Sequence, residues 1–173
     1  PGRFRASLYL SGLLLQQLAQ VRPEVVADFR ELVTTGAIEL VGGTEAHTLA
    51  FLYDRDAFET QVNAHRELMG KELGQQPRFL AQPGLHYTNP LGFKAQQMGF
   101  EGLIVEGAPQ VLGQRSPNHL YHPVHMPDFP LLLRNALRSD DIGLRFGDAQ
   151  WEAYPLTPDK FASWMLQEPG EVV

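Results

Sequence analysis

The sequence contains no cysteine, which excludes disulfide bonds, thiolate catalysis and cysteine-ligated metal. It also has no excess of basic residues, because 14 Lys and Arg stand against 20 Asp and Glu and give a net charge of −6. This balance argues against nucleic acid and anionic membranes as partners. No apolar run is long enough to span a membrane and no export signal is visible, so we expect a cytoplasmic protein without a membrane partner.

The remaining composition is that of an ordinary globular protein. The 173 residues are 43% hydrophobic and 20% charged, which is enough for one domain with a hydrophobic core over residues 1–173. The chain opens directly into a strand-like segment at Phe4 and stops at Glu171-Val172-Val173, which resembles the start of another strand. We therefore expect the chain to be the central part of a longer protein, truncated at both ends.

Short extended runs alternate with amphipathic helical segments along most of the chain. The expected strands cover residues 3–10, 37–41, 78–81 and 102–105. Four helices are expected, over residues 11–22, from Pro23 to Gly36, from Asp56 to Gly74 and from Asn89 to Gly99. Alternation of this kind predicts an α/β fold, with a parallel sheet or barrel built from right-handed βαβ units.

The alternation ends after Gly107. Residues 108–130 are rich in proline and histidine and are expected to form an irregular loop. Residues 131–133 and 142–146 look extended, and Thr157-Pro158 is expected to begin a last helix. Asp56 with Glu59 three residues later indicates a capping box for the helix that follows residue 55.

Polar residues near the predicted strand ends are the candidates for a functional site, because parallel α/β folds place their sites there. Glu39 lies inside the second strand, His47 follows a double glycine, and Glu106 ends the fourth strand. Asp140 and Asp141 come later in the chain. Each of these residues also has an alternative to a role in the site. For Glu39 the alternative is an ion pair or a solvent-exposed position, and for His47 it is an ordinary place in a loop. The two aspartates could instead belong to a turn or cap a helix.

Other site classes find little support. His119, His122 and His125 do not have the spacing of helical metal ligands, and Pro123 lies among them. No glycine-rich phosphate loop follows a strand, and Ser139 has no nucleophile-elbow context. We therefore expect no metal site at these histidines.

Several ordered segments resemble glycoside hydrolase family 57, in its α-amylase-like group. The resemblance covers Gly36-Ala-Ile-Glu-Leu-Val-Gly-Gly43 with His47, Glu106-Gly107, and residues 112–118, 133–135, 139–146 and 151–157. Any one of these segments alone would be weak, but together and in order they are specific.

The resemblance implies the central portion of an incomplete (β/α)7 barrel with parallel strands. It implies activity on α-glucan or maltooligosaccharides, as in α-amylase or 4-α-glucanotransferase, by a retaining mechanism without a cofactor. In such a mechanism a glutamate attacks the sugar, and an aspartate about 5–5.5 Å away transfers the proton. The family's aspartate block is expected a few residues beyond Val173.

The glutamate is replaced in this chain. The family's nucleophile block, Asn-Thr-Glu-Leu-Ile-Tyr, matches Gln82-Pro83-Gly84-Leu85-His86-Tyr87, so Gly84 stands at the nucleophile position. Glycine has no side chain that could attack an anomeric carbon. We therefore expect an α-glucan-binding homologue that is catalytically impaired.

Two alternatives remain open. The protein could be an active retaining hydrolase or transglycosylase that uses a relocated carboxylate, with Glu106 as the first choice and Glu39 as the second. It could also serve only structure or interaction. The predicted substrate-binding residues are Glu39, His47, Tyr87, Glu106, Asp140, Asp141 and Trp151. Tyr87 and Trp151 are candidates for stacking on sugar rings, and ordinary packing is an equal alternative for Trp151.

Overall fold

The computed structural model describes residues 4–171, and the chain divides into two compact units, residues 1–104 and 105–173. The expected single domain over residues 1–173 stays a prediction. Two other expectations, a first strand that begins at Arg3 and a last strand at Val172-Val173, fall outside the described residues.

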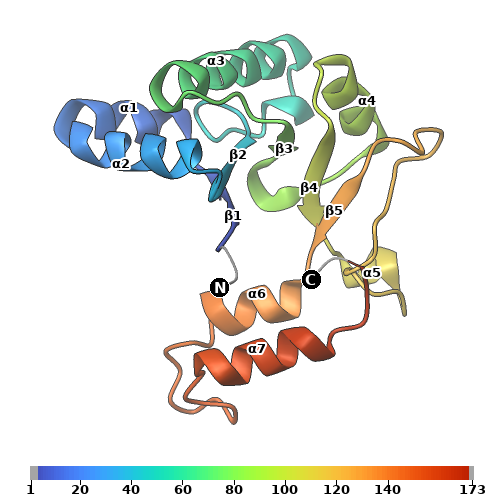
Figure 1. Ribbon diagram of the computed structural model, residues 1–173. Coiled ribbons are helices and arrows are strands. Elements are labelled where there is room, and N and C mark those ends of the chain that lie inside the picture. The colour runs from blue at the N-terminus through green and yellow to red at the C-terminus, as the bar shows by residue number, and fades with distance from the viewer. Residues whose placement is uncertain (1–3, 172–173) are drawn as a thin grey trace. The chain divides into compact units, whose positions relative to one another are not determined.

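The first unit is built on parallel strands that follow one another in chain order (Figure 1). They are β1 (Ala6–Tyr9), β2 (Ile38–Gly42), β3 (Phe79–Ala81) and the first residues of β4 (Gly102–Glu106). Ala6 pairs with Ile38, Val41 with Phe79, and Phe79 with Gly102. All four strands therefore end at the same edge of the sheet.

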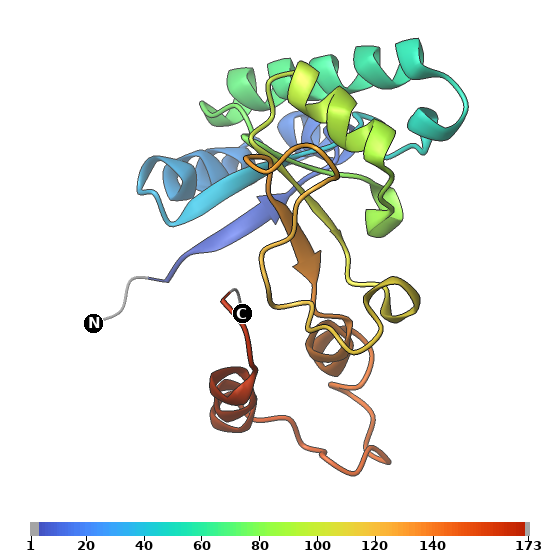
Figure 2. The same cartoon turned by 90° about the vertical axis from the view of Figure 1, so that its right-hand side faces the viewer.

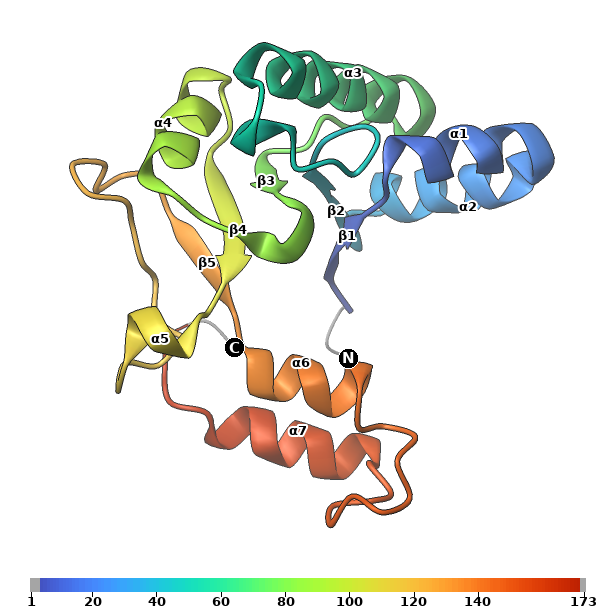
Figure 3. The ribbon, with the colours of Figure 1, turned by 180° about the vertical axis from the view of Figure 1, so that it is seen from behind.

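Helices connect these strands and cover one face of the sheet (Figure 3). They are α1 (Gly12–Val21), α2 (Pro23–Thr34), α3 (Arg55–Leu73) and α4 (Asn89–Gln97), with short 3-10 turns η1 (Ala50–Leu52) and η2 (Pro83–Leu85). Apolar side chains of the strands and helices pack together, and one buried cluster comprises Leu10, Leu15, Val26, Val33, Leu40, Met69 and Leu73. Further buried side chains, among them Phe58, Leu80 and Leu103, add to the hydrophobic stabilisation of the unit.

Local sequence signals set the helix ends. Ser11 caps α1 by accepting the amide hydrogen of Leu14, and Gly74 ends α3 in the left-handed conformation with φ of +77°. The expected cap of α3 is wrong by two residues. The cap is Asp54, whose carboxylate accepts from the amides of Asp56 and Ala57, because the helix begins at residue 55.

The second unit holds β5 (Leu131–Arg134) and the helices α5 (Pro109–Leu112), α6 (Ala136–Gly143) and α7 (Pro158–Gln167). Tyr121 forms an antiparallel bridge with Leu131, which anchors the long loop between α5 and β5 (Figure 2). Thr157 caps α7 as expected. In the part of the chain that the structure describes, no helix is long and apolar enough to cross a bilayer.

The expected extended segment at residues 142–146 is wrong, because α6 runs to Gly143 and a turn follows it. Asn135 caps α6 by accepting the amide hydrogen of Arg138. Asp141 forms ion pairs with Arg138 three residues before it and with Arg145 four residues after it. These spacings fit a helix and its continuation, not a strand.

Candidate functional site

The carboxyl ends of β1 and β2 bring Tyr9 and His47 together. The Tyr9 hydroxyl lies 2.9 Å from Nδ1 of His47. His47 is exposed and has a φ of +54°, which few residues other than glycine adopt. Its amide donates to the carbonyl of Thr44 at 3.0 Å and so fixes the turn. Burial raises the pKa of Tyr9, so this hydroxyl stays protonated at neutral pH.

Gly43 allows this close arrangement. A Cβ atom at Gly43 would lie 2.5 Å from Cε2 of Tyr9 and 3.1 Å from the carbonyl oxygen of Ala81. Any side chain there would displace the tyrosine ring. The double glycine before His47 therefore permits close backbone approach, as the sequence indicated.

Gly84 lies in η2, directly after β3 and at the same edge of the sheet. Its φ of +68° and ψ of +7° are left-handed, and Leu85 follows with φ of +52°. A Cβ atom built on Gly84 meets no heavy atom within 4 Å. The turn thus has no carboxylate at residue 84, and the space beside Gly84 is open. The match of residue 84 to the family's nucleophile position stays a prediction.

Three buried polar atoms of Gln82 and His86, on either side of Gly84, have no hydrogen-bond partner among residues 4–171. Neither Oε1 nor Nε2 of the Gln82 amide has a partner, and Nε2 of His86 has none. Nδ1 of His86 donates to the carbonyl oxygen of Pro83 at 3.1 Å, which leaves Nε2 for another partner. Leaving such groups unpaired costs roughly 1–3 kcal/mol each, which favours a polar ligand at this turn.

Tyr87 continues the same segment. Its hydroxyl donates to Oδ1 of Asn89 at 2.8 Å, which holds the ring at the start of α4. The side chain is half-buried, and this burial raises its pKa. Tyr87 therefore lies at the edge of the sheet that carries His47 and Gly84.

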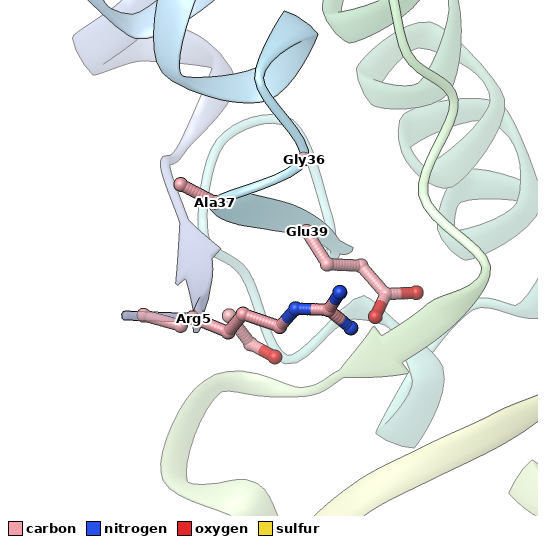
Figure 4. A pocket seen from close by; sticks show the side chains of 6 residues that line it. Arg5, Gly36, Ala37 and Glu39 are labelled. Carbon is pink, nitrogen blue, oxygen red and sulfur yellow. The ribbon is translucent and has the colours of Figure 1, made fainter. Parts of the chain in front are cut away.

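Glu39 lies at the opposite, amino edge of the sheet, as the second residue of β2. Its Oε1 is 3.5 Å from Nη1 of Arg78, and Arg78 also donates to Glu101 at 2.9 Å. Arg5, Ser7 and Glu39 line a hollow of about 280 Å³, in which the guanidinium of Arg5 points toward the Glu39 carboxylate (Figure 4). The amino edge of such sheets usually serves stability. The structure thus does not bring Glu39 together with the other predicted residues of this unit.

In the second unit, Arg134 bridges two of the predicted residues, Glu106 and Asp140. Its Nη1 donates to Oε2 of Glu106 at 3.1 Å, and its Nη2 donates to Oδ1 of Asp140. Burial alone would lower the pKa of Arg134, but these hydrogen bonds outweigh it and raise that pKa. The three side chains are about 30% exposed, so the cluster is accessible from solvent. Arg134 lies in segment 133–135, which carries part of the family resemblance, but it was not among the predicted substrate-binding residues.

Asp141 points away from this cluster into the packing between α6 and its neighbours. Its side chain is 3% exposed, and both of its oxygens are occupied. Arg138 donates to Oδ2 at 2.9 Å, and Arg145 donates twice to Oδ1 at 2.9 and 2.7 Å. This arrangement favours a structural role, and binding of substrate by Asp141 stays a prediction.

Trp151 packs against Trp164 of α7. The ring centroids are 6.0 Å apart at an interplanar angle of 71°, an edge-to-face contact. Arg138 links α6 to α7 through Glu168, with Nε donating to Oε1 at 2.6 Å. Figure 1 shows these two helices side by side. Trp151 is therefore part of the packing of this unit and also borders an open hollow.

Histidine clusters do not form a metal centre in the described part of the chain. No three His, Asp or Glu side chains there gather closely enough to hold an ion. His119 instead lies 3.9 Å from Glu171.

Known proteins resemble nearly the whole sequence. A model of Glycosyl hydrolase family 57 matches residues 2–173. A protein of Methanocaldococcus jannaschii named "Putative alpha-amylase" is 36% identical over 172 residues, which are 98% of this chain and 36% of that protein. The chain thus spans about a third of the length of this relative.

Solved structures show the same fold. The 4-α-glucanotransferase of Thermococcus litoralis matches with a TM-score of 0.72 at 14% identity, over 83% of this chain and 23% of that one. The GH57-type branching enzyme of Pyrococcus horikoshii matches with a TM-score of 0.57 at 20% identity, over 71% of this chain and 26% of that one. These likenesses confirm the predicted α/β class, part of a (β/α)7 barrel with parallel strands. Together with the match along residues 2–173, they show that the chain belongs to glycosyl hydrolase family 57.

Proposed function

We propose that this protein is an α-amylase-like member of its family that binds α-glucan and is impaired in hydrolysis. The observation that carries the proposal is Gly84, which leaves the turn after β3 without the glutamate that attacks the sugar. Retention requires two carboxyl groups about 5–5.5 Å apart, so the loss of one removes the covalent step.

The backbone of the turn also suits glycine better than glutamate. The left-handed conformation at residue 84 costs an ordinary L-residue roughly 1–2 kcal/mol, and Leu85 already adopts a positive φ next to it. The replacement is thus accompanied by a local conformation that glycine adopts without strain. This supports a turn that no longer serves nucleophilic attack.

The same edge of the sheet offers groups that suit sugar hydroxyls. The Tyr9–His47 pair, the Tyr87 ring and the unpartnered polar atoms of Gln82 and His86 combine donors, acceptors and an aromatic face. Carbohydrate sites need this mixture, because each hydroxyl both donates and accepts. The choice of α-glucan rests on the family and on the names of its amylase and glucanotransferase members.

Isothermal titration with maltooligosaccharides, run beside an assay for released reducing ends, tests the proposal. We expect saturable binding without release above background. His47→Ala is expected to weaken binding about tenfold, the loss of one or two hydrogen bonds. Glu101→Gln, at the amino edge of the sheet, is the matched control and should bind like the wild type. Absence of binding, or turnover by the wild type, would contradict the proposal.

A second candidate function is an active retaining hydrolase or transglycosylase that uses Glu106. The observation in its favour is the place of Glu106 at the carboxyl end of β4, where its Oε2 accepts from Nη1 of Arg134 at 3.1 Å. The same guanidinium occupies Oε2 of Glu106, and a relocated nucleophile is easily misaligned by more than catalysis tolerates. Hydrolysis by the wild type that disappears in Glu106→Gln would establish this alternative.

A cytoplasmic location and the absence of nucleic acid and membrane partners stay predictions. Cell fractionation tests the location, and titration with a nucleic acid duplex or anionic vesicles tests the partners.

A further inference from the structure

Both tryptophans of the chain line one hollow in the second unit. An open surface hollow of about 370 Å³ is lined by Trp151, Glu152, Ala153, Lys160 and Trp164. This volume falls within the roughly 300–1,000 Å³ of small-molecule sites. Lys160 and Trp164 are four residues apart on α7, so they lie on the same face of that helix.

The indole rings are held in place from behind. The guanidinium of Arg145 lies 5.6 Å from the ring centroid of Trp151, and that of Arg138 lies 5.1 Å from the ring centroid of Trp164. Both guanidinium groups are fixed by the buried carboxylate of Asp141. A ligand would therefore meet aromatic walls that are already ordered, which reduces the entropy lost on binding.

The rim of the hollow offers both a donor and an acceptor. Nζ of Lys160 donates to the carbonyl oxygens of Ala153 at 2.8 Å and Pro155 at 3.0 Å. An ammonium group has three hydrogens, so one remains for a ligand. Glu152 is exposed and presents carboxylate oxygens that only accept.

The charges around the hollow limit the class of ligand. The positive charges of Arg138, Arg145 and Lys160 are matched by three carboxylates, because Asp141 and Glu168 pair with the arginines and Glu152 lies at the rim. The hollow therefore has no excess charge that would select a cation, although aromatic pairs often bind one, or an anion. A neutral molecule with hydroxyl groups and an apolar face satisfies both the rim and the aromatic walls, and a sugar ring has this character.

We propose that this hollow binds a glucosyl unit of an α-glucan, with Trp151 and Trp164 as walls and Glu152 and Lys160 at the rim. The site uses no residue of the Gly84 turn. The identity of the sugar as glucose rests on the proposed function, whereas the neutral character of the ligand follows from the hollow itself.

Tryptophan fluorescence tests the proposal directly, because both tryptophans of the chain belong to the site. Titration with maltotriose is expected to change the emission saturably. Glu152→Gln keeps both tryptophans. It is expected to raise the maltotriose concentration at half-maximal fluorescence change about five- to tenfold, because one charge-assisted hydrogen bond is lost. Lys71→Met, on α3 of the first unit, is the control and should leave the midpoint unchanged.

The outcomes separate this site from the proposed function. Calorimetric binding of maltotriose without a fluorescence change, or a midpoint that Glu152→Gln leaves unaltered, would overturn the site and leave glucan binding intact. Neither heat nor a fluorescence change would overturn both. Saturable quenching by tetramethylammonium at concentrations similar to those of maltotriose would assign the hollow to cations and so also overturn the proposal.

Discussion

The backbone N–H of Gly43 donates a hydrogen bond to Nδ1 of His65 at 3.0 Å, from the end of β2 to a fully buried ring of α3. Because Nδ1 accepts here, Nε2 carries the hydrogen and donates to the carbonyl of Leu10 at 2.7 Å. The ring thus joins the ends of β1 and β2, next to Tyr9 and His47, and must be neutral to do so.

This relationship predicts that stability falls in mild acid. Burial lowers the pKa of His65 below its ordinary 6.5, although the bond to Leu10 and the charge of Glu45 partly oppose the shift. Below pH 6.5 the unfolded chain therefore binds a proton that the folded chain does not. As the pH falls below 6.5, the free energy of unfolding decreases by up to about 1.4 kcal/mol per pH unit until the lowered pKa of His65 is reached. Above pH 6.5, His65 makes no contribution to the pH dependence. Urea denaturation from about pH 7.5 to about pH 5.5 measures the slope.

Replacement of the ring separates His65 from other titrating groups. His65→Gln is expected to lower stability at neutral pH and to flatten the slope in this range. His122→Gln, at an exposed histidine, should keep the slope of the wild type. A His65→Gln slope equal to that of the wild type would show that the ring is not the source.

Asp141→Asn is expected to destabilise the second unit by about 2–3 kcal/mol. The change leaves Arg138 and Arg145 without their buried counter-charge. The expected loss of stability is smaller than for a fully buried ion pair, because both arginines are partly exposed. Urea denaturation measures the loss. Asp128→Asn, at an exposed aspartate, should stay within about 0.5 kcal/mol of the wild type. Equal stability of the two variants would argue that Asp141 does not hold this unit together.

Two glycine-to-alanine variants distinguish steric contact from backbone strain. Gly43→Ala places Cβ 2.5 Å from the Tyr9 ring and is expected to cost about 1–3 kcal/mol and to shift Tyr9 fluorescence or its NMR signals. Gly84→Ala meets no atom and is expected to cost only about 1 kcal/mol, from its positive φ. A larger loss for Gly84→Ala than for Gly43→Ala would mean that the space beside Gly84 is not open.

Much of the first unit could be predicted from the sequence. Period-two alternation and helical periodicity are local signals, and glycines and caps mark the ends of elements within a few residues. The strand–helix order, the end of α3 at Gly74 and the start of α7 at Thr157-Pro158 followed from them. The resemblance predicts that Gly84 stands at the family's nucleophile position, but it did not predict the left-handed backbone of this residue.

The second unit was harder to predict because long-range ion pairs shape it. Alternating apolar residues at 142–146 suggested a strand, whereas the helix is held by Asp141 between Arg138 and Arg145. The three- and four-residue spacings were visible, but burial of the carboxylate depends on packing against α7. In the same way, the pairing of Glu39 with Arg78 depends on strand register, which a single strand does not reveal.

If no carboxylate of this protein attacks the sugar, fluoride release from α-maltosyl fluoride should not exceed the spontaneous rate. Fluoride leaves without help from a general acid, so its release above background reports nucleophilic attack even where proton transfer is lost, and a retaining enzyme releases it as the glycosyl intermediate forms and is hydrolysed. A fluoride electrode measures this rate, and we predict the spontaneous rate for the wild type and for Glu106→Gln alike. Release by the wild type well above the spontaneous rate, lost in Glu106→Gln or in another carboxylate variant, would show that a carboxylate attacks the sugar.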